Sequence, residues 1–75
     1  MNFGEKIRRE REAKGLRIRE LAEQVGVSFT TIARWETGTR RPGLMNLHRL
    51  SQALGVSMSD LLKAGDSSPE SIIPQ

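Results

Sequence analysis

Two short helical patterns, separated by about three residues, constrain this chain more than any other feature of its sequence. Residues 18–25 carry apolar side chains at helical spacing, and a second helix is expected from its N-cap Ser28 to about residue 37. So tight a connection needs a small residue where the helices approach and a residue that tolerates positive φ between them. Ala22 and Gly26 meet these two needs. The sequence therefore predicts two helices packed at a tight corner.

Three more helices and a tail are expected around this corner. The helices cover about residues 3–14, 44–54 and 58–63, and no segment alternates apolar and polar residues long enough to predict a strand. Residues 65–75 combine Asp, Ser, Glu and Pro in quick succession, which is typical of a tail or linker. We therefore expect one all-α domain over residues 1–64, followed by a flexible C-terminal tail over residues 65–75.

Local signals mark where these helices begin and which side chains turn inward. Asn2 with Glu5, and Ser57 with Asp60, have the spacing of capping boxes. Trp35 continues the apolar stripe begun by Ile32, so we expect it in the core rather than as a stacking platform. The predicted inner faces of the last two helices consist of Leu44, Leu47, Leu50 and Leu54, and of Met58, Leu61 and Leu62.

Composition excludes several classes of protein. Cysteine is absent, so the chain has no disulfide or thiolate metal site, and a cytoplasmic location is the expectation for so small a domain. No apolar stretch approaches the roughly 20 residues of a membrane span, and residues 1–12 lack the apolar segment of a signal peptide. His48 is the one histidine, and no carboxylate pair, nucleophile motif or phosphate-binding glycine loop accompanies it. We expect no enzymatic activity, no cofactor and no metal.

Positive charge is concentrated in the first two-thirds of the chain. Residues 1–52 contain 11 Lys or Arg against 6 Asp or Glu, whereas residues 53–75 contain 1 against 3. This distribution favours a polyanionic partner on one side of the molecule, although arginine-rich helices can also be merely soluble.

A set of residues and short runs occurs in one order along the chain. It consists of Ile7 with Arg11, then Ala22, Gly26 and Ile32, the runs Trp35-Glu36-Thr37-Gly38 and Arg40-Arg41-Pro42, the segment from Leu47 to Gly55-Val56, and Leu61-Leu62. In this order and spacing, the set resembles the Cro/cI phage-repressor type of helix-turn-helix protein, the XRE family, over about residues 3–63. The resemblance implies a compact five-helix, lambda-repressor-like DNA-binding domain that binds double-stranded DNA at a palindromic operator as a homodimer.

The resemblance also implies which side chains face DNA. Arg34 can form a bidentate contact with guanine, or instead pair with Glu36 or an upstream carboxylate. Phe29 can cover a thymine methyl or fold inward, and Ser28 caps the helix whether or not it contacts DNA. The expected base-contacting residues are Ser28, Phe29, Thr30, Ala33 and Arg34. The expected phosphate contacts, any of which could be solvated surface groups instead, are Arg17, Arg19, Thr37, Thr39, Arg40 and Arg41.

Two further expectations concern the contacts that hold the helix of residues 28–37 in place. The family commonly pairs an arginine with a glutamate at the positions of Arg11 and Glu36, which links the first helix to the end of the third. The chain departs from the family where the second helix begins, because Arg17 and Ile18 replace Thr or Ser followed by Gln. The side-chain cap is therefore lost there, and the glutamine contact with phosphate cannot form.

Three functional hypotheses follow. The first is a transcription regulator, most simply a repressor that occupies a promoter. The second is an antitoxin or protein-interaction module that binds a partner protein through the tail, residues 67–75, with Ile72 and Ile73, and also regulates its own promoter. The third treats the chain as a fragment of a larger sensor protein. The apolar residues expected to be available for a dimer interface are Val56, Met58 and Leu62.

Overall fold

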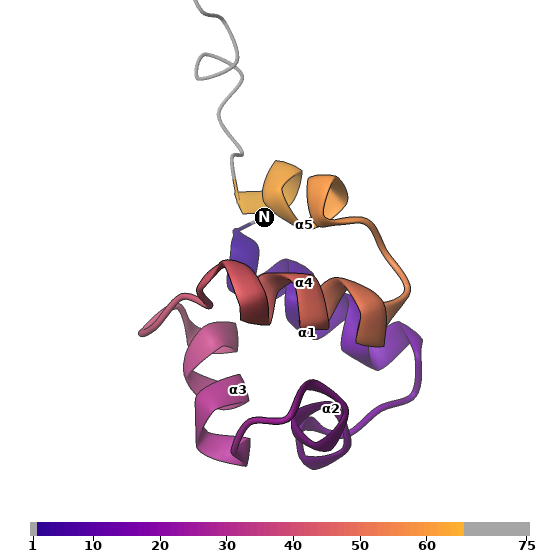
Figure 1. Ribbon diagram of the computed structural model, residues 1–75, viewed down its shortest axis with the longest axis vertical. Helices are drawn as coiled ribbons and strands as arrows, with labels where there is room; N and C mark the ends of the chain where they lie inside the picture. Colours follow the sequence, from indigo (N-terminus) through magenta and orange to yellow (C-terminus); the bar gives the residue numbers. More distant parts are fainter. Residues whose placement is uncertain (1, 66–75) are drawn as a thin grey trace, which may run out of the picture.

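The computed structural model describes residues 2–65, which form five helices and no strand. The all-α, five-helix expectation is confirmed (Figure 1). The last helix extends two residues beyond the predicted end, and residues 66–75, including the proposed partner-binding segment with Ile72 and Ile73, lie outside the described residues. The helices are α1 (Phe3–Ala13), α2 (Ile18–Val25), α3 (Phe29–Thr37), α4 (Leu44–Leu54) and α5 (Met58–Gly65).

Side chains fix the beginnings of α1 and α5 as expected. Asn2 Oδ1 accepts a hydrogen bond from the Glu5 N–H at 2.8 Å, and the Asn2 N–H donates to Glu5 Oε1 at 3.2 Å, so the capping box at α1 is complete. At α5, Ser57 Oγ accepts from the Asp60 N–H at 3.0 Å. These bonds satisfy amide groups that have no partner within their helix.

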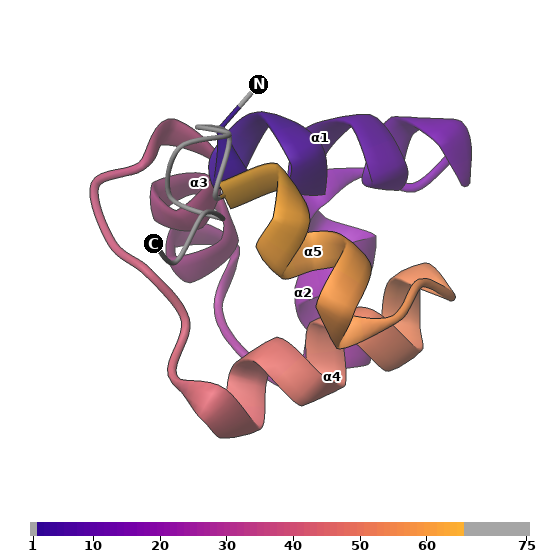
Figure 2. The ribbon, with the colours of Figure 1, turned by 90° about the horizontal axis from the view of Figure 1, so that it is seen from above.

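The helices enclose one core. In Figure 2, α1 and α4 lie on opposite sides of the molecule, with α2 and α5 between them. α1 packs against α3 and α5, α2 packs against α3 and α4, and α4 also contacts α5. The α2–α3 corner therefore forms one end of the domain, opposite α5 (Figure 1). The buried hydrophobic residues are Phe3, Ile7, Leu21, Ala22, Val25, Ile32, Trp35, Leu47, Leu50, Leu54 and Leu61.

Two leucines that were expected on inner faces are exposed. Leu44 is 76% exposed, although it fits the apolar spacing of α4; it is the first residue of that helix and directly follows the α3–α4 loop. Leu62 is 48% exposed, because its neighbour Leu61 takes the inward position on α5 and is fully buried. Adjacent helical residues point about 100° apart, so only one of the two can face the core.

α1 approaches α3 most closely at Gly4. A Cβ atom placed on Gly4 would lie 2.7 Å from the Trp35 carbonyl oxygen and closer still to the Glu36 carbonyl oxygen. No ordinary Cβ contact is that short. The absence of a side chain at Gly4 therefore sets the distance between the start of α1 and the end of α3.

Two kinds of feature are missing from the described residues. None of their helices has the length and apolar character needed to cross a membrane. Nor do His, Asp and Glu side chains among them gather in a group of three or more that could hold a metal ion.

Candidate DNA interface

The corner between α2 and α3 is closed by backbone and side-chain hydrogen bonds. Gly26 has a φ of +88°, and its N–H donates to the Ala22 carbonyl at 2.8 Å. The Val27 N–H donates to the same carbonyl at 3.0 Å. Ser28 Oγ then accepts from the Thr31 N–H at 3.2 Å and caps α3. The chain thus turns from one helix to the next within three residues, as predicted from Ala22 and Gly26.

The two faces of α3 differ in exposure. Ile32 and Trp35 are 0% and 3% exposed, which confirms that they belong to the core. Phe29 is 51% exposed, so the alternative in which it folds inward is wrong. The remaining residues expected to contact bases divide into the exposed Ser28, Thr30 and Arg34 and the partly buried Ala33. The exposed residues among these candidates therefore bring two hydroxyls, one guanidinium and one aromatic ring to the outer side of α3 and its N-cap.

Exposed basic and hydroxyl groups lie on both sides of this helix in the sequence. All six residues expected to contact phosphate, namely Arg17, Arg19, Thr37, Thr39, Arg40 and Arg41, are exposed. Among the described residues, the salt bridges involve none of these arginines and not Arg34. These guanidinium groups are therefore free of internal salt bridges within the described residues and can interact with a polyanion.

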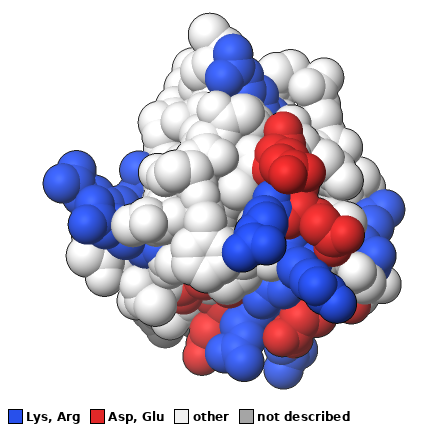
Figure 3. Space-filling view, turned by 90° about the horizontal axis from the view of Figure 1, so that it is seen from below, with Lys and Arg blue, Asp and Glu red and all other residues white. Residues whose placement is uncertain are grey.

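Figure 3 shows the face of the molecule at the α2–α3 end. On the side where α3 and the α3–α4 loop lie, a group of basic side chains stands clear of acidic ones. The lysine and arginine residues of these two segments are Arg34, Arg40 and Arg41. Elsewhere on this face, basic and acidic side chains alternate. The positive charge next to α3 is thus locally uncompensated.

Several of the candidate contacts are held in place by neighbouring groups. Thr37 Oγ1 donates to the Arg34 carbonyl at 3.2 Å, and its hydroxyl lies 3.0 Å from that of Thr39. The guanidinium of Arg41 lies over the ring of Phe3, 5.2 Å from its centroid, at the distance of a cation–π contact. These contacts restrain side chains that would otherwise lose more conformational freedom on binding.

A carboxylate compensates in part for the missing cap of α2. A guanidinium has no acceptor atom, so Arg17 cannot cap the helix with its side chain. Instead, the Arg17 N–H donates to Glu20 Oε1 at 2.7 Å. This is one half of a capping box, and it places negative charge in the first turn of α2, where the helix dipole favours it. The sequence analysis recognised the loss of the cap but not this replacement, although Glu20 has the right spacing to signal it.

The expected ion pair between Arg11 and Glu36 is present and nearly buried. Arg11 Nε donates to Glu36 Oε2 at 2.7 Å, and Nη2 donates to Oε1 at 3.3 Å. The two side chains are only 11% and 7% exposed. Arg11 Nη1 also donates to the Leu16 carbonyl at 2.8 Å. One guanidinium therefore joins α1, the α1–α2 connection and the last turn of α3.

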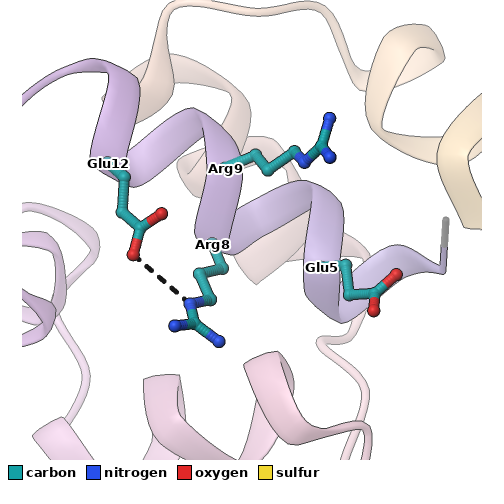
Figure 4. A pocket seen from close by; sticks show the side chains of 4 residues that line it. All are labelled: Glu5, Arg8, Arg9 and Glu12. Atoms are coloured by element: carbon teal, nitrogen blue, oxygen red, sulfur yellow. Dashed lines mark hydrogen bonds and ion pairs between the residues drawn. The ribbon is translucent and has the colours of Figure 1, made fainter.

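The outer surface of α1 carries a separate cluster of charges. Figure 4 shows Glu5, Arg8, Arg9 and Glu12 around a shallow depression, with all four side chains projecting from this one helix. Arg8 Nε lies 3.3 Å from Glu12 Oε2. Charges of both signs alternate here, and the cluster shares no residue with the α2–α3 corner. It is a solvated helix surface rather than part of the candidate interface.

Comparison with known proteins places this geometry in a family. A family model described as Helix-turn-helix matches residues 7–61. The chain belongs to this helix-turn-helix family, in its Cro/cI type. The helix-turn-helix chain is 39% identical over 62 residues to the transcriptional activator BcrR of Enterococcus faecalis, and 36% identical over 61 residues to the prophage-derived transcriptional regulator YonR of Bacillus subtilis. The matches cover 83% and 81% of this chain but only 30% and 56% of these relatives, so the chain is much shorter than either.

Solved structures agree with the family assignment. The P22 c2 repressor in complex with a synthetic operator superposes with a TM-score of 0.82 at 39% identity, covering 85% of this helix-turn-helix chain and 97% of that chain. SinR in complex with DNA superposes with a TM-score of 0.76 at 33% identity, covering 80% and 97%. Both similarities extend over nearly the whole of the compared chains.

One residue that positions the candidate interface was missed by the sequence analysis. Gly4 lies against the last turn of α3, yet it was treated only as part of the first helical pattern. A glycine inside a helical pattern lowers the stability of the helix, and a close approach of another backbone is a common reason for it; Gly4 at this position was the available signal.

Proposed function

We propose that this protein is a transcription regulator that binds double-stranded DNA as a homodimer and represses the promoter it occupies. The observation that carries the proposal is the split character of α3. Ile32 and Trp35 fasten one side of the helix to the core, while Phe29, Thr30 and Arg34 face solvent. A helix held in this way fits the major groove, which is about 12 Å wide.

The exposed groups suggest a division of labour on DNA. Arg34 provides two parallel donors for the O6 and N7 atoms of guanine, while Ser28 and Thr30 provide short hydroxyls near the N-terminus of α3. Arg17 and Arg19, before α3, and Arg40, after it, would contact phosphates and set the register without reading sequence. The similar structures support this assignment, because the P22 c2 repressor is bound to an operator and SinR to DNA.

A dimer would read two copies of the same half-site. Palindromic sites match the twofold symmetry of such a dimer, with half-sites about one helical turn of DNA apart. Of the apolar residues expected at the interface, Leu62 is exposed, whereas Val56 and Met58 pack partly against the core. Leu62 is therefore the residue of this group that is best placed to meet a symmetry mate.

Selection from a random DNA library tests the proposal. The full chain should enrich a palindrome, and the selected duplex should bind with a strong dependence on salt. The flanking Arg17, Arg19 and Arg40 of both protomers together fall within the range of about 6–10 phosphate contacts. For that range, the affinity for DNA falls roughly 10³–10⁵-fold when salt is raised from 50 to 200 mM. A selected pool without any common motif would refute sequence-specific binding.

A reporter assay tests the direction of regulation. With the selected palindrome placed over a promoter, expression of the chain should lower transcription, because a bound domain blocks access to the site. BcrR is named as an activator, so relatives alone do not fix the direction. An increase in transcription would contradict the repressor role while leaving DNA binding intact.

A further inference from the structure

An open hollow lies where the first turns of α2 and α3 meet. It has a volume of about 550 Å³ and is lined by Arg11, Arg17, Ile18, Arg19, Glu20 and Phe29. Ile18 is the first residue of α2 and Phe29 the first residue of α3. The hollow therefore lies on the N-terminal side of the recognition helix, and its shape depends on the tight α2–α3 corner.

The hollow combines apolar walls with a basic rim. Phe29 leaves 51% of its surface exposed, and the half-buried Ile18 packs against the core on its other side. Arg17 and Arg19, which flank Ile18 in the sequence, are exposed. The half-exposed ring of Phe29 therefore presents apolar surface in the same hollow as the two arginines. The arrangement suits a ligand with an apolar group next to negative charge.

Two of the four charged side chains that line the hollow already have partners. The guanidinium of Arg11 is engaged by Glu36 and by the Leu16 carbonyl. The carboxylate of Glu20 accepts from the Arg17 N–H. The hollow therefore offers a ligand apolar contact and positive charge rather than directional hydrogen bonds to a base edge. A base recognised here has to be distinguished by its shape and its apolar surface.

We infer that Ile18 and Phe29 form a subsite for the 5-methyl group of a thymine in the major groove. This inference rests on the proposed function and adds to it one base of the half-site. Among the four bases, thymine alone displays an apolar group on its major-groove edge. The N-terminal residues of a recognition helix are those that reach base edges, which is where Phe29 lies. Arg17 and Arg19 then meet the backbone phosphates beside that base.

Replacement of thymine by uracil isolates the methyl group, because the two bases differ in nothing else. Each thymine of the selected half-site is replaced in turn by uracil, and the dissociation constant is measured by fluorescence anisotropy at one salt concentration. One position should weaken binding by about fourfold for each methyl removed, the amount expected for losing one buried methyl-sized group. The Phe29→Ala chain should bind the thymine and uracil duplexes equally well at that position.

Two controls keep the outcome specific. Phe29→Ala is expected to fold, because the side chain is exposed and alanine favours a helix, and a thermal melt checks this. Leu44→Ala removes another exposed apolar side chain, one that does not line the hollow, and should retain the fourfold preference. If no thymine is sensitive to uracil, or if Phe29→Ala keeps the preference, the subsite is refuted while the selected motif still supports sequence-specific binding. A selection without a motif refutes both.

Discussion

The contact between Gly4 and the end of α3 leads to a sharp prediction for Gly4→Ala. In an isolated helix this substitution is favourable, by up to about 1 kcal/mol. Here the added Cβ would meet the carbonyl oxygens of Trp35 and Glu36, which are backbone atoms and cannot rotate away. The Trp35 oxygen would have to retreat by about 0.7 Å, from 2.7 Å to an ordinary 3.4 Å, and the Glu36 oxygen by more.

The steric cost should exceed the gain in helix propensity. Overpacking of a well-packed interior costs about 1–3 kcal/mol, and the short distances at Gly4 place it at the upper end of that range. We therefore expect a net loss of about 2 kcal/mol in the free energy of unfolding, or roughly 8–16 °C in Tm for a domain of this size. Because Glu36 also pairs with Arg11, any shift of its backbone should move the recognition helix as well.

Thermal and urea unfolding followed by circular dichroism measures this loss, and DNA titration of the folded variant measures the accompanying shift. Gly43→Ser is the matched control, since a Cβ at Gly43 has no neighbour within 4 Å and serine is a favourable N-cap for α4. The control should leave Tm unchanged or raise it. A Gly4→Ala domain as stable as the parent would show that α1 and α3 can separate freely. That result would refute the claim that the missing side chain at Gly4 sets their distance.

Three other predictions test the anchoring and the chemistry of α3. Arg11→Met should lower the free energy of unfolding by about 3–5 kcal/mol in urea melts, because it leaves a nearly buried carboxylate without a partner; an unchanged midpoint would refute the anchoring role. Ser28→Ala removes the cap of α3 and should cost about 1 kcal/mol, or roughly 4–8 °C in Tm, whereas Ser59→Ala on exposed α5 surface should not; equal losses would contradict the cap. Arg34→Ala should lose about 1–3 kcal/mol of discrimination at one base pair, while Arg40→Ala should weaken all duplexes alike and reduce the salt slope by about 1. Identical binding profiles for these two variants would argue against separate base and phosphate roles.

Local signals predicted most of the fold. α2 and α4 begin and end at the predicted residues, and Gly26 has the positive φ expected of it. These features depend on interactions within a few residues, namely caps, turns and helical periodicity, which a single sequence displays directly. The burial of Trp35 also followed from the helical spacing of its own segment.

Features that depend on how the helices pack together were not predictable. Leu44 fits the spacing of the inner face of α4, yet it is exposed as the first residue of that helix. Helical periodicity indicates the side of a helix on which a residue lies, but it does not indicate whether another element packs against that residue. The contact at Gly4 and the hollow between Ile18 and Phe29 likewise arise from segments brought together only by the fold. The base contacts themselves remain predictions that await the bound duplex.

The way α3 is fastened has a consequence for changing the target of this protein. Stability rests on Ile32, Trp35 and the pair of Arg11 with Glu36, none of which is among the side chains proposed to contact DNA. The outward positions Thr30 and Arg34 support none of this packing, so libraries randomised there should yield folded proteins with new operators. Selection on such a scaffold can therefore change the operator that is recognised without changing the core that holds α3.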